Sequence, residues 1–202
     1  ERIVARAAGN AFYLEELVRH VAAHGDESLP ETVIAMARSR LDALEPEARR
    51  VLRVGSVFGE CMWEKGVVHL LGGTRTPETV REWLDTLVAR EILEPGRRDR
   101  FGGEADFVFR HALLRDAAYA TLVEEDRKLG HRLAAEWLEE VGEREAQVLA
   151  ERHLRAGDTE RAAPYLLLAA QARMAGNDLE GAATTAEKGL ACRPEGETRG
   201  LL

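Results

Sequence analysis

Apolar residues recur three or four positions apart along most of this 202-residue chain, and this spacing constrains the fold more than any other feature. Such spacing places apolar side chains on one face of an α-helix, so each stretch predicts an amphipathic helix with one buried face. The spacing changes near residue 91 and returns near residue 113. We therefore predict an all-α, mainly helical fold with one short interruption.

Proline and glycine divide the first half of the chain into five helical stretches. Proline is tolerated in the first turn of a helix and glycine often follows the last turn, so these residues mark where helices begin and end. The expected helices span about residues 14–24, 30–44, 46–58, 63–71 and 77–88. The residues expected to be buried on the second helix are Val33, Met36, Ala37, Leu41 and Leu44.

The helical spacing is interrupted by two expected strands and a loop. Glu91–Pro95 and Asp106–Phe109 have the pattern of short strands, and the polar, glycine-bearing stretch Gly96–Gly103 joins them. Three helices followed by a small β-hairpin is the order of a winged helix. Helical spacing then resumes in two further stretches, the second of which has an expected buried face of Leu129, Leu133, Trp137, Leu138 and Val141.

The last third of the chain has the pattern of stacked helical hairpins. Gly157-Asp158 and Asn177-Asp178 each follow an apolar helix and precede an alanine-rich one. The positions that match the small-residue and proline sites of a tetratricopeptide second helix are Ala182, Ala186, Gly189 and Pro194. An ordinary helical hairpin is the alternative, because alanine is common in any helix.

These patterns divide the chain into three parts. We expect a helical segment at residues 1–45, a winged-helix domain at 46–122 and tetratricopeptide-like helical hairpins at 123–202. The chain opens inside an apparent helix without an initiator methionine, so we expect it to belong to a longer protein. Its longest apolar run, Tyr165–Ala170, is far shorter than the roughly 20 residues of a membrane span, and its two distant cysteines suit a reducing cytoplasm.

No motif for common enzyme chemistry is present. The sequence lacks G-x-x-x-x-G-K-[ST], G-x-G-x-x-G and G-x-S-x-G, so we expect no catalytic residue and no cofactor bound by this chain. His20 and His24 have the spacing of a helical metal pair but lack an H-E-x-x-H signature, so we interpret them as surface histidines and expect no metal. The carboxylate pairs Glu15-Glu16, Glu124-Glu125 and Glu139-Glu140 are interpreted as solvated helix charge.

A winged helix can bind DNA, but the charges of this one argue against it. The net charge is -8, and the polar face of the candidate reading helix, residues 77–90, carries three acidic residues against two arginines. Base-reading helices favour Arg, Lys, Asn and Gln. The loop between the expected strands and its edge carry equal numbers of basic and acidic residues: Arg97, Arg98, Arg100, Asp99, Glu104 and Asp106. We therefore expect no direct nucleic-acid binding.

Three stretches together resemble one family, the bacterial STAND-type regulatory ATPases. Gly9–Val18 looks like the G-N-P-F-[FY]-L-E-E-L segment that opens the helical lid of that family. Leu29–Leu44 is similar to its L-P-x-x-[VL]…R-L-D-x-L segment, and Phe109–Tyr119 to its F-x-H-x-L-[IL]-[RQ]-[ED]-x-x-Y segment. The three occur in the family's order, around the expected winged helix and before the expected repeats. The resemblance therefore covers nearly the whole chain.

The resemblance implies a regulatory role. Family members carry an AAA-like, phosphate-loop ATPase core upstream of this region, which binds ATP or ADP with Mg²⁺, and often a kinase, cyclase or DNA-binding output domain. ADP holds the lid and the winged helix against the core, and ATP releases them. The partners implied for this chain are the ATPase core of its own protein and, through the helical repeats, protein partners or an inducer.

Three positions match nucleotide-contacting segments of the family. His111 matches the histidine that contacts the ADP β-phosphate, and Asn10 and Ala11 lie in the lid motif. Relatives have proline, packed near the adenine, where this chain has Ala11, so that contact is not reproduced. Ala112 replaces the acidic residue that follows the histidine in plant and animal members. The alternative role for His111 is to cap the helix after the loop.

We therefore interpret the chain as a non-catalytic, cytoplasmic signalling fragment. Two alternatives belong to other classes. A winged-helix transcription regulator that binds DNA directly would be favoured by a basic reading helix. A helical-repeat scaffold for protein partners would be favoured if residues 46–122 formed no winged helix.

Overall fold

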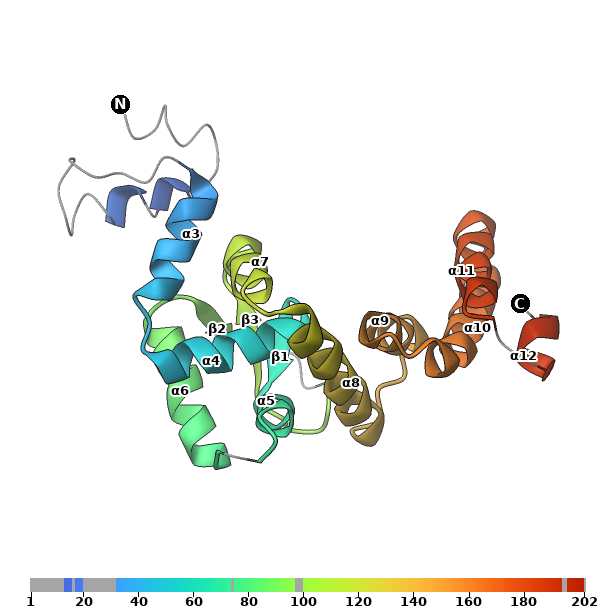
Figure 1. Ribbon diagram of the computed structural model, residues 1–202, viewed down its shortest axis with the longest axis horizontal. Helices are drawn as coiled ribbons and strands as arrows, with labels where there is room; N and C mark the ends of the chain where they lie inside the picture. Colours follow the sequence, from blue (N-terminus) through green and yellow to red (C-terminus); the bar gives the residue numbers. More distant parts are fainter. Residues whose placement is uncertain are drawn as a thin grey trace.

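The computed structural model describes residues 13–15, 17–19, 32–73, 75–96, 100–193 and 196–201 (Figure 1). Within these ranges the chain is mainly α-helical, as predicted, with one small sheet. The first two ranges are short helical turns. The later elements are α3 (Val33–Asp42), α4 (Pro46–Gly55), the 3₁₀ turn η1 (Ser56–Phe58), β1 (Cys61–Trp63), α5 (Glu64–Leu70), α6 (Pro77–Ala89), β2 (Leu93–Pro95), β3 (Asp106–Phe109), α7 (Ala112–Ala120), α8 (Glu124–Glu140), α9 (Ala146–Ala156), α10 (Thr159–Ala175), α11 (Leu179–Ala191) and α12 (Gly196–Leu201).

Elements α4 to β3 follow the order of a winged helix: helix, strand, two helices and two strands. The predicted pairing of β2 with β3 is confirmed, antiparallel, with Leu93 opposite Phe109. Strand β1 was not predicted; it pairs with β3 on the other side, with Cys61 opposite Val108, so the sheet has the order β1-β3-β2. Three residues are too few to show an alternating pattern, and Gly59, at φ 99°, turns the chain into β1.

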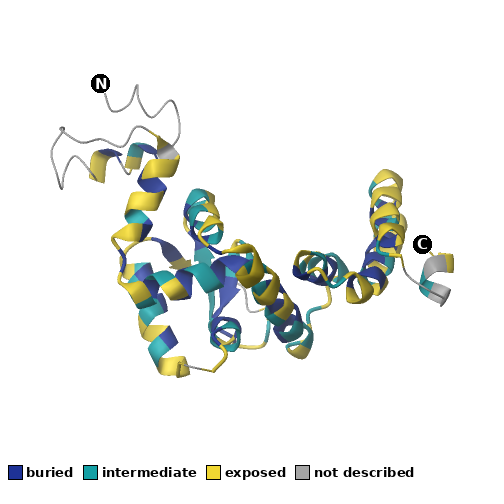
Figure 2. Cartoon of the chain, in the orientation of Figure 1, coloured by how far each residue is buried: buried dark blue, intermediate teal, exposed yellow. Residues whose placement is uncertain are grey.

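The predicted buried face of α3 is confirmed where it is described, since Met36, Ala37, Leu41 and Leu44 are all buried. Helix α3 begins after Thr32, whose hydroxyl accepts a hydrogen bond from the Ala35 N–H at 3.1 Å. On α8, in contrast, the predicted burial of Leu129 is wrong, because half of its side chain is exposed. Figure 2 shows the buried faces of the helices turned toward the sheet and toward one another.

An aromatic cluster joins the winged helix to the helices that follow it. Phe101 from the loop between β2 and β3 lies 5.0 Å from Trp63 and 5.7 Å from Trp137 of α8, measured between ring centroids. Phe58 packs edge-on against both tryptophans, at 5.8 Å and 5.6 Å. Aromatic pairs in this geometry add stability beyond the area they bury. Winged helix and α8 therefore share one core.

Helices α8 to α11 pack in succession, each against the next, and lead away from the winged helix (Figure 1). Both predicted turns are confirmed. Asp158 and Asp178 each cap the next helix, accepting hydrogen bonds from the Arg161 N–H at 3.0 Å and the Gly181 N–H at 2.9 Å. Gly157 and Asn177, just before them, adopt positive φ. The same turn, a residue with positive φ followed by an aspartate that caps the next helix, therefore occurs both before α10 and before α11.

The interpretation of Glu139 as a solvated charge is wrong. Its carboxylate accepts a hydrogen bond from the Tyr165 hydroxyl at 2.9 Å and from Arg161 at 2.6 Å. His153, which is fully buried on α9, places Nε2 2.9 Å from the same carboxylate. Glu139 therefore ties together α8, α9 and α10. Partners 14 to 26 residues away are invisible to a scan for adjacent carboxylates.

We predict that Gly66→Ala destabilises the protein. A Cβ at Gly66 would lie 2.8 Å from Phe58 Cζ and 3.2 Å from Trp137 Cε3, inside the aromatic cluster. Overpacking of this kind costs about 1–3 kcal/mol, which urea unfolding would measure. Gly200→Ala is the matched control, because a Cβ there meets nothing within 4 Å. Equal unfolding midpoints for the two variants would contradict the expected crowding.

The lowered pKa of His131 leads us to predict that the protein loses stability in acid. Burial, with Arg152 and Arg155 nearby, lowers the pKa of His131 to about 3. An unfolded histidine titrates near 6.5, so between these pH values the unfolded chain binds more protons and acid favours unfolding. The free energy of unfolding should fall below about pH 6.5, by up to about 1.4 kcal/mol per pH unit.

His131→Gln removes this titration. Denaturant unfolding at several pH values should therefore show a flatter acid dependence for the variant than for the wild type. Parallel curves would contradict the assignment of the acid sensitivity to His131.

Candidate functional site: the contact between the lid segment and the winged helix

The structure brings two of the three motifs together. His111, in the N-cap position of α7, places Nε2 3.4 Å from a carboxylate oxygen of Glu15 in the first motif. The His111 side chain makes no hydrogen bond to the helix end, so the expected alternative of a capping side chain is not seen. Asn10 and Ala11, the other two predicted site residues, lie outside the described residues.

Arg110 lies at the centre of the charges around His111. Its guanidinium approaches Glu15 at 3.8 Å, Glu91 at 3.5 Å and Glu94 at 3.9 Å. Glu91 also forms an ion pair with Arg19, four positions after Glu15 in the chain. Residues 13–15 and 17–19, named the lid segment after the motif that they resemble, therefore share one charged network with β2 and the residues just before α7.

A reciprocal pair of arginines joins α3 to the end of α6. Arg40 of α3 donates to the carbonyl oxygens of Arg90 at 2.7 Å and Glu91 at 3.3 Å. Arg90 donates in return to the Ala43 carbonyl at 3.3 Å and pairs with Glu45 at 2.6 Å. The last carbonyls of a helix lack partners within the helix and carry partial negative charge, so a guanidinium binds them well. Each helix end is thereby held by a cation from the other.

Glu91 has an unusual backbone. Its φ of 56° is in the left-handed region, which costs a non-glycine residue about 1–3 kcal/mol. Hydrogen bonds fix the turn, from the Ile92 N–H to Leu87 O at 3.0 Å and from the Arg110 N–H to Ile92 O at 3.1 Å. The turn brings the Glu91 carboxylate to Arg19 and Arg110. Glu91 was expected to begin a strand, but β2 begins at Leu93.

Beside this network is an open hollow of about 310 Å³. Its charged lining is three arginines and one carboxylate, Arg19, Arg40, Arg90 and Glu91. In the described part of the chain, no three His, Cys, Asp or Glu side chains gather as a metal site would need. The arrangement joins the two segments through charges near the surface.

A DNA-binding winged helix would turn α6 and the loop after β2 toward DNA. Here the arginines that the structure describes on these two elements form ion pairs with carboxylates of the same chain. Arg81 of α6 pairs with Glu64 at 3.0 Å and Asp85 at 3.2 Å and lies over the Phe107 ring. Arg100 of the loop pairs with Glu143 at 2.9 Å and Glu145 at 3.0 Å, both in the turn between α8 and α9. Arg97 and Arg98 lie outside the described residues, as do His20 and His24.

Comparisons with protein-family models, with curated proteins and with solved structures give no match. Of the helices in the described ranges, none has the length and apolar character that crossing a membrane requires.

We predict that Glu91→Gln loosens the lid segment. The amide keeps the size of the side chain but removes the charge that Arg19 and Arg110 share. Because these pairs are exposed and each contributes little, hydrogen exchange at the amides of residues 13–19 should become about 2- to 5-fold faster. Glu94→Gln is the matched control, since Glu94 makes one long contact, 3.9 Å from Arg110. Equal exchange in both variants would contradict a special role for Glu91.

Proposed function

We propose that this chain is the regulatory, non-catalytic part of a STAND-type signal-transduction ATPase. In this proposal it couples the nucleotide state of an ATPase core elsewhere in its protein to partner or inducer sensing by the helical hairpins. ATP or ADP with Mg²⁺ would bind that core, in the cytoplasm. The observation that carries the proposal is the contact between the first motif and the winged-helix motif, with Glu15 3.4 Å from His111.

The contact supports the proposal because each motif is a short local stretch of sequence, and nothing within either stretch requires the two to meet. Glu15 and Arg19 flank the end of the lid-like motif, and Arg110 and His111 belong to the winged-helix motif, far along the chain. Their side chains meet at the same charged network. Segments that respond together to one nucleotide need such proximity.

The strength of the contact also fits a switch. Exposed ion pairs contribute roughly 0.2–1 kcal/mol each, so a few of them can be broken by a ligand that favours one state by a few kcal/mol. The aromatic cluster of Phe58, Trp63, Phe101 and Trp137 belongs to a large buried core and is far harder to open. The lid segment, whose buried Tyr13 and Leu17 form a small separate cluster with Met36, would therefore cost less to detach than the aromatic cluster.

The stacked helices give one observation in favour of the alternative of a helical-repeat scaffold. The two proposals can be told apart, because only a regulatory module changes its partner binding with the nucleotide state of an ATPase core. Direct DNA binding is the weaker alternative, since Arg81 and Arg100 are already paired with carboxylates of the chain.

We predict that His111→Ala speeds ADP release from the complete protein. Loss of one charge-assisted hydrogen bond, roughly 1.5–3 kcal/mol, should raise the ADP off-rate by about 10- to 100-fold and shift the balance toward the open, active state. The off-rate is measured with a fluorescent ADP analogue.

His69→Ala on α5 is the histidine control and should leave ADP release unchanged. Melting of both variants of the 202-residue chain separates the two roles of His111. An unchanged off-rate together with a marked loss of stability would refute the nucleotide role and leave a structural one.

A further inference from the structure

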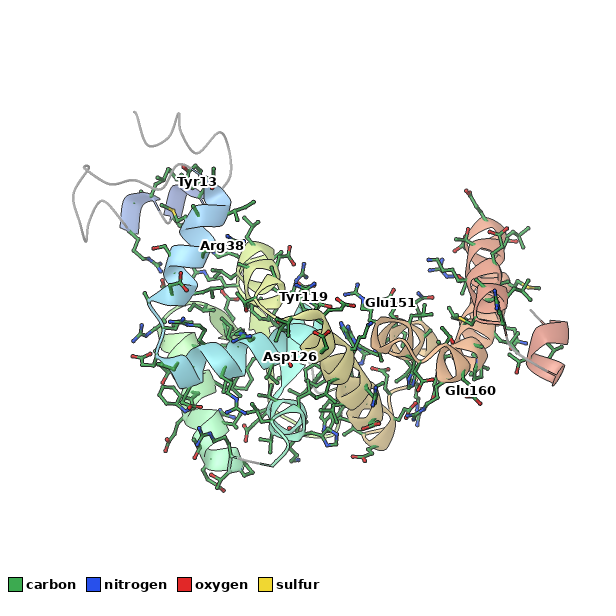
Figure 3. The ribbon with its side chains drawn as sticks, in the orientation of Figure 1. Tyr13, Arg38, Tyr119, Asp126, Glu151 and Glu160 are labelled. Atoms are coloured by element: carbon green, nitrogen blue, oxygen red, sulfur yellow. The ribbon has the colours of Figure 1, made fainter. Side chains whose placement is uncertain are left out.

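A second hollow lies near the C-terminal end of α7 and is lined by residues of α7, α8 and α9, whereas His111 of the lid contact is at the N-terminal end of α7. Its volume is about 350 Å³, and its floor is formed by Tyr119 and Leu154. Charged residues on its rim are Glu124, Arg127, Lys128 and Arg155. Figure 3 shows Tyr119 near the junction of α7 and α8, with Glu151 on the neighbouring α9.

The lining of this hollow has more positively charged than negatively charged side chains. Glu124 is the one rim carboxylate, 4.0 Å from Arg127 and 3.7 Å from Lys128. Arg155, exposed at the end of α9, makes no ion pair or hydrogen bond with any residue that the structure describes. Three cations therefore face one carboxylate, in a chain whose net charge is -8.

Arg155 also acts on two buried groups near the hollow, although burial is the larger cause of both pKa shifts. Arg152, behind the hollow, donates to the Phe58 carbonyl at 2.6 Å, and burial followed by the charge of Arg155 lowers its pKa to about 10. Glu151 opposes this effect from the same helix. The pKa of His131 is lowered to about 3 by burial and then by Arg152 and Arg155, so this histidine is neutral at pH 7. Its Nε2 lies 2.8 Å from the Tyr119 hydroxyl.

We propose that this hollow is a binding site for a phosphate group, held by Arg155, Lys128 and Arg127. A doubly charged phosphate would neutralise the excess of two positive charges on the rim. Guanidinium groups bind phosphate oxygens through paired N–H donors, and a lysine adds a flexible point charge. Arg127 is already oriented, since it donates to the Ala120 carbonyl at 3.2 Å and lies over the Tyr119 ring. The site is separate from the lid contact and does not rest on the proposed function.

Two sources can supply this chemistry, free phosphate and a phosphorylated side chain of a protein partner. The probe for the first is inorganic phosphate, titrated into the ¹⁵N-labelled chain at constant ionic strength. Amide signals of Tyr119, Leu154 and Gly157 should shift and saturate, with a dissociation constant on the order of 1 mM. A phosphoserine peptide, with its unphosphorylated form as control, is the probe for the second source.

Arg155→Gln should weaken phosphate binding about 2- to 5-fold, as expected for one exposed charge pair, and Lys128→Gln with Arg155→Gln should abolish saturation. Arg132→Gln is the matched control, because Arg132 is an exposed arginine of α8 that does not line the hollow. Saturation at similar concentrations of phosphate and phosphopeptide supports a site for free phosphate, and markedly tighter binding of the phosphopeptide supports a phosphorylated partner. Shifts that never saturate, or that weaken equally in Arg132→Gln, would overturn the proposal.

Discussion

Arginine side chains that donate to carbonyl oxygens at or near the ends of helices link successive elements around the buried core of the described part of this molecule. A helix end exposes carbonyls without partners, and a guanidinium carries several N–H donors in a rigid plane, so a single arginine can bind two of them. The chain has 25 arginines and three lysines, which suits this use. The contacts that follow the pattern are Arg40 to Arg90 O, Arg49 to Asp42 O and Leu44 O, Arg53 to Thr121 O, Arg90 to Ala43 O, Arg127 to Ala120 O and Arg152 to Phe58 O.

The polar contacts between elements differ in how much apolar packing surrounds them. This difference separates contacts that are hard to break from contacts that break more easily. Arg152 reaches the Phe58 carbonyl beside the aromatic cluster, where apolar packing supports the hydrogen bond. The ion pairs of Glu91 with Arg19 and Arg110 are exposed instead, and among the described residues no apolar cluster surrounds them. Screening by salt weakens exposed pairs and leaves buried packing nearly unchanged. The joint to α8 should therefore persist under conditions that release the lid segment.

Much of the fold could be predicted from the helical spacing and the turn residues, because both depend on residues that lie close together in the sequence. The face of α3, the pairing of β2 with β3 and the corners at Asp158 and Asp178 follow from neighbours a few residues apart. The candidate site depends on contacts of another kind. Arg40 binds backbone carbonyls 50 residues away, and any residue type supplies a carbonyl, so no side-chain pattern marks the acceptor. Glu91 at positive φ was hidden for a related reason, since the tertiary hydrogen bonds of the turn impose that conformation.

The loop after β2 makes contacts within the protein in place of the phosphate contacts that the same loop makes in a DNA-binding winged helix. In a winged helix that reads DNA, the loop and the reading helix need free cations to meet phosphates. Here Phe101 packs against both Trp63 and Trp137, and Arg100 is bound by Glu143 and Glu145. The loop is thus a bridge from the sheet to the turn between α8 and α9. The winged helix therefore carries the Arg110 network at one end of β3 and the Arg100 contacts to the turn before α9 at the other.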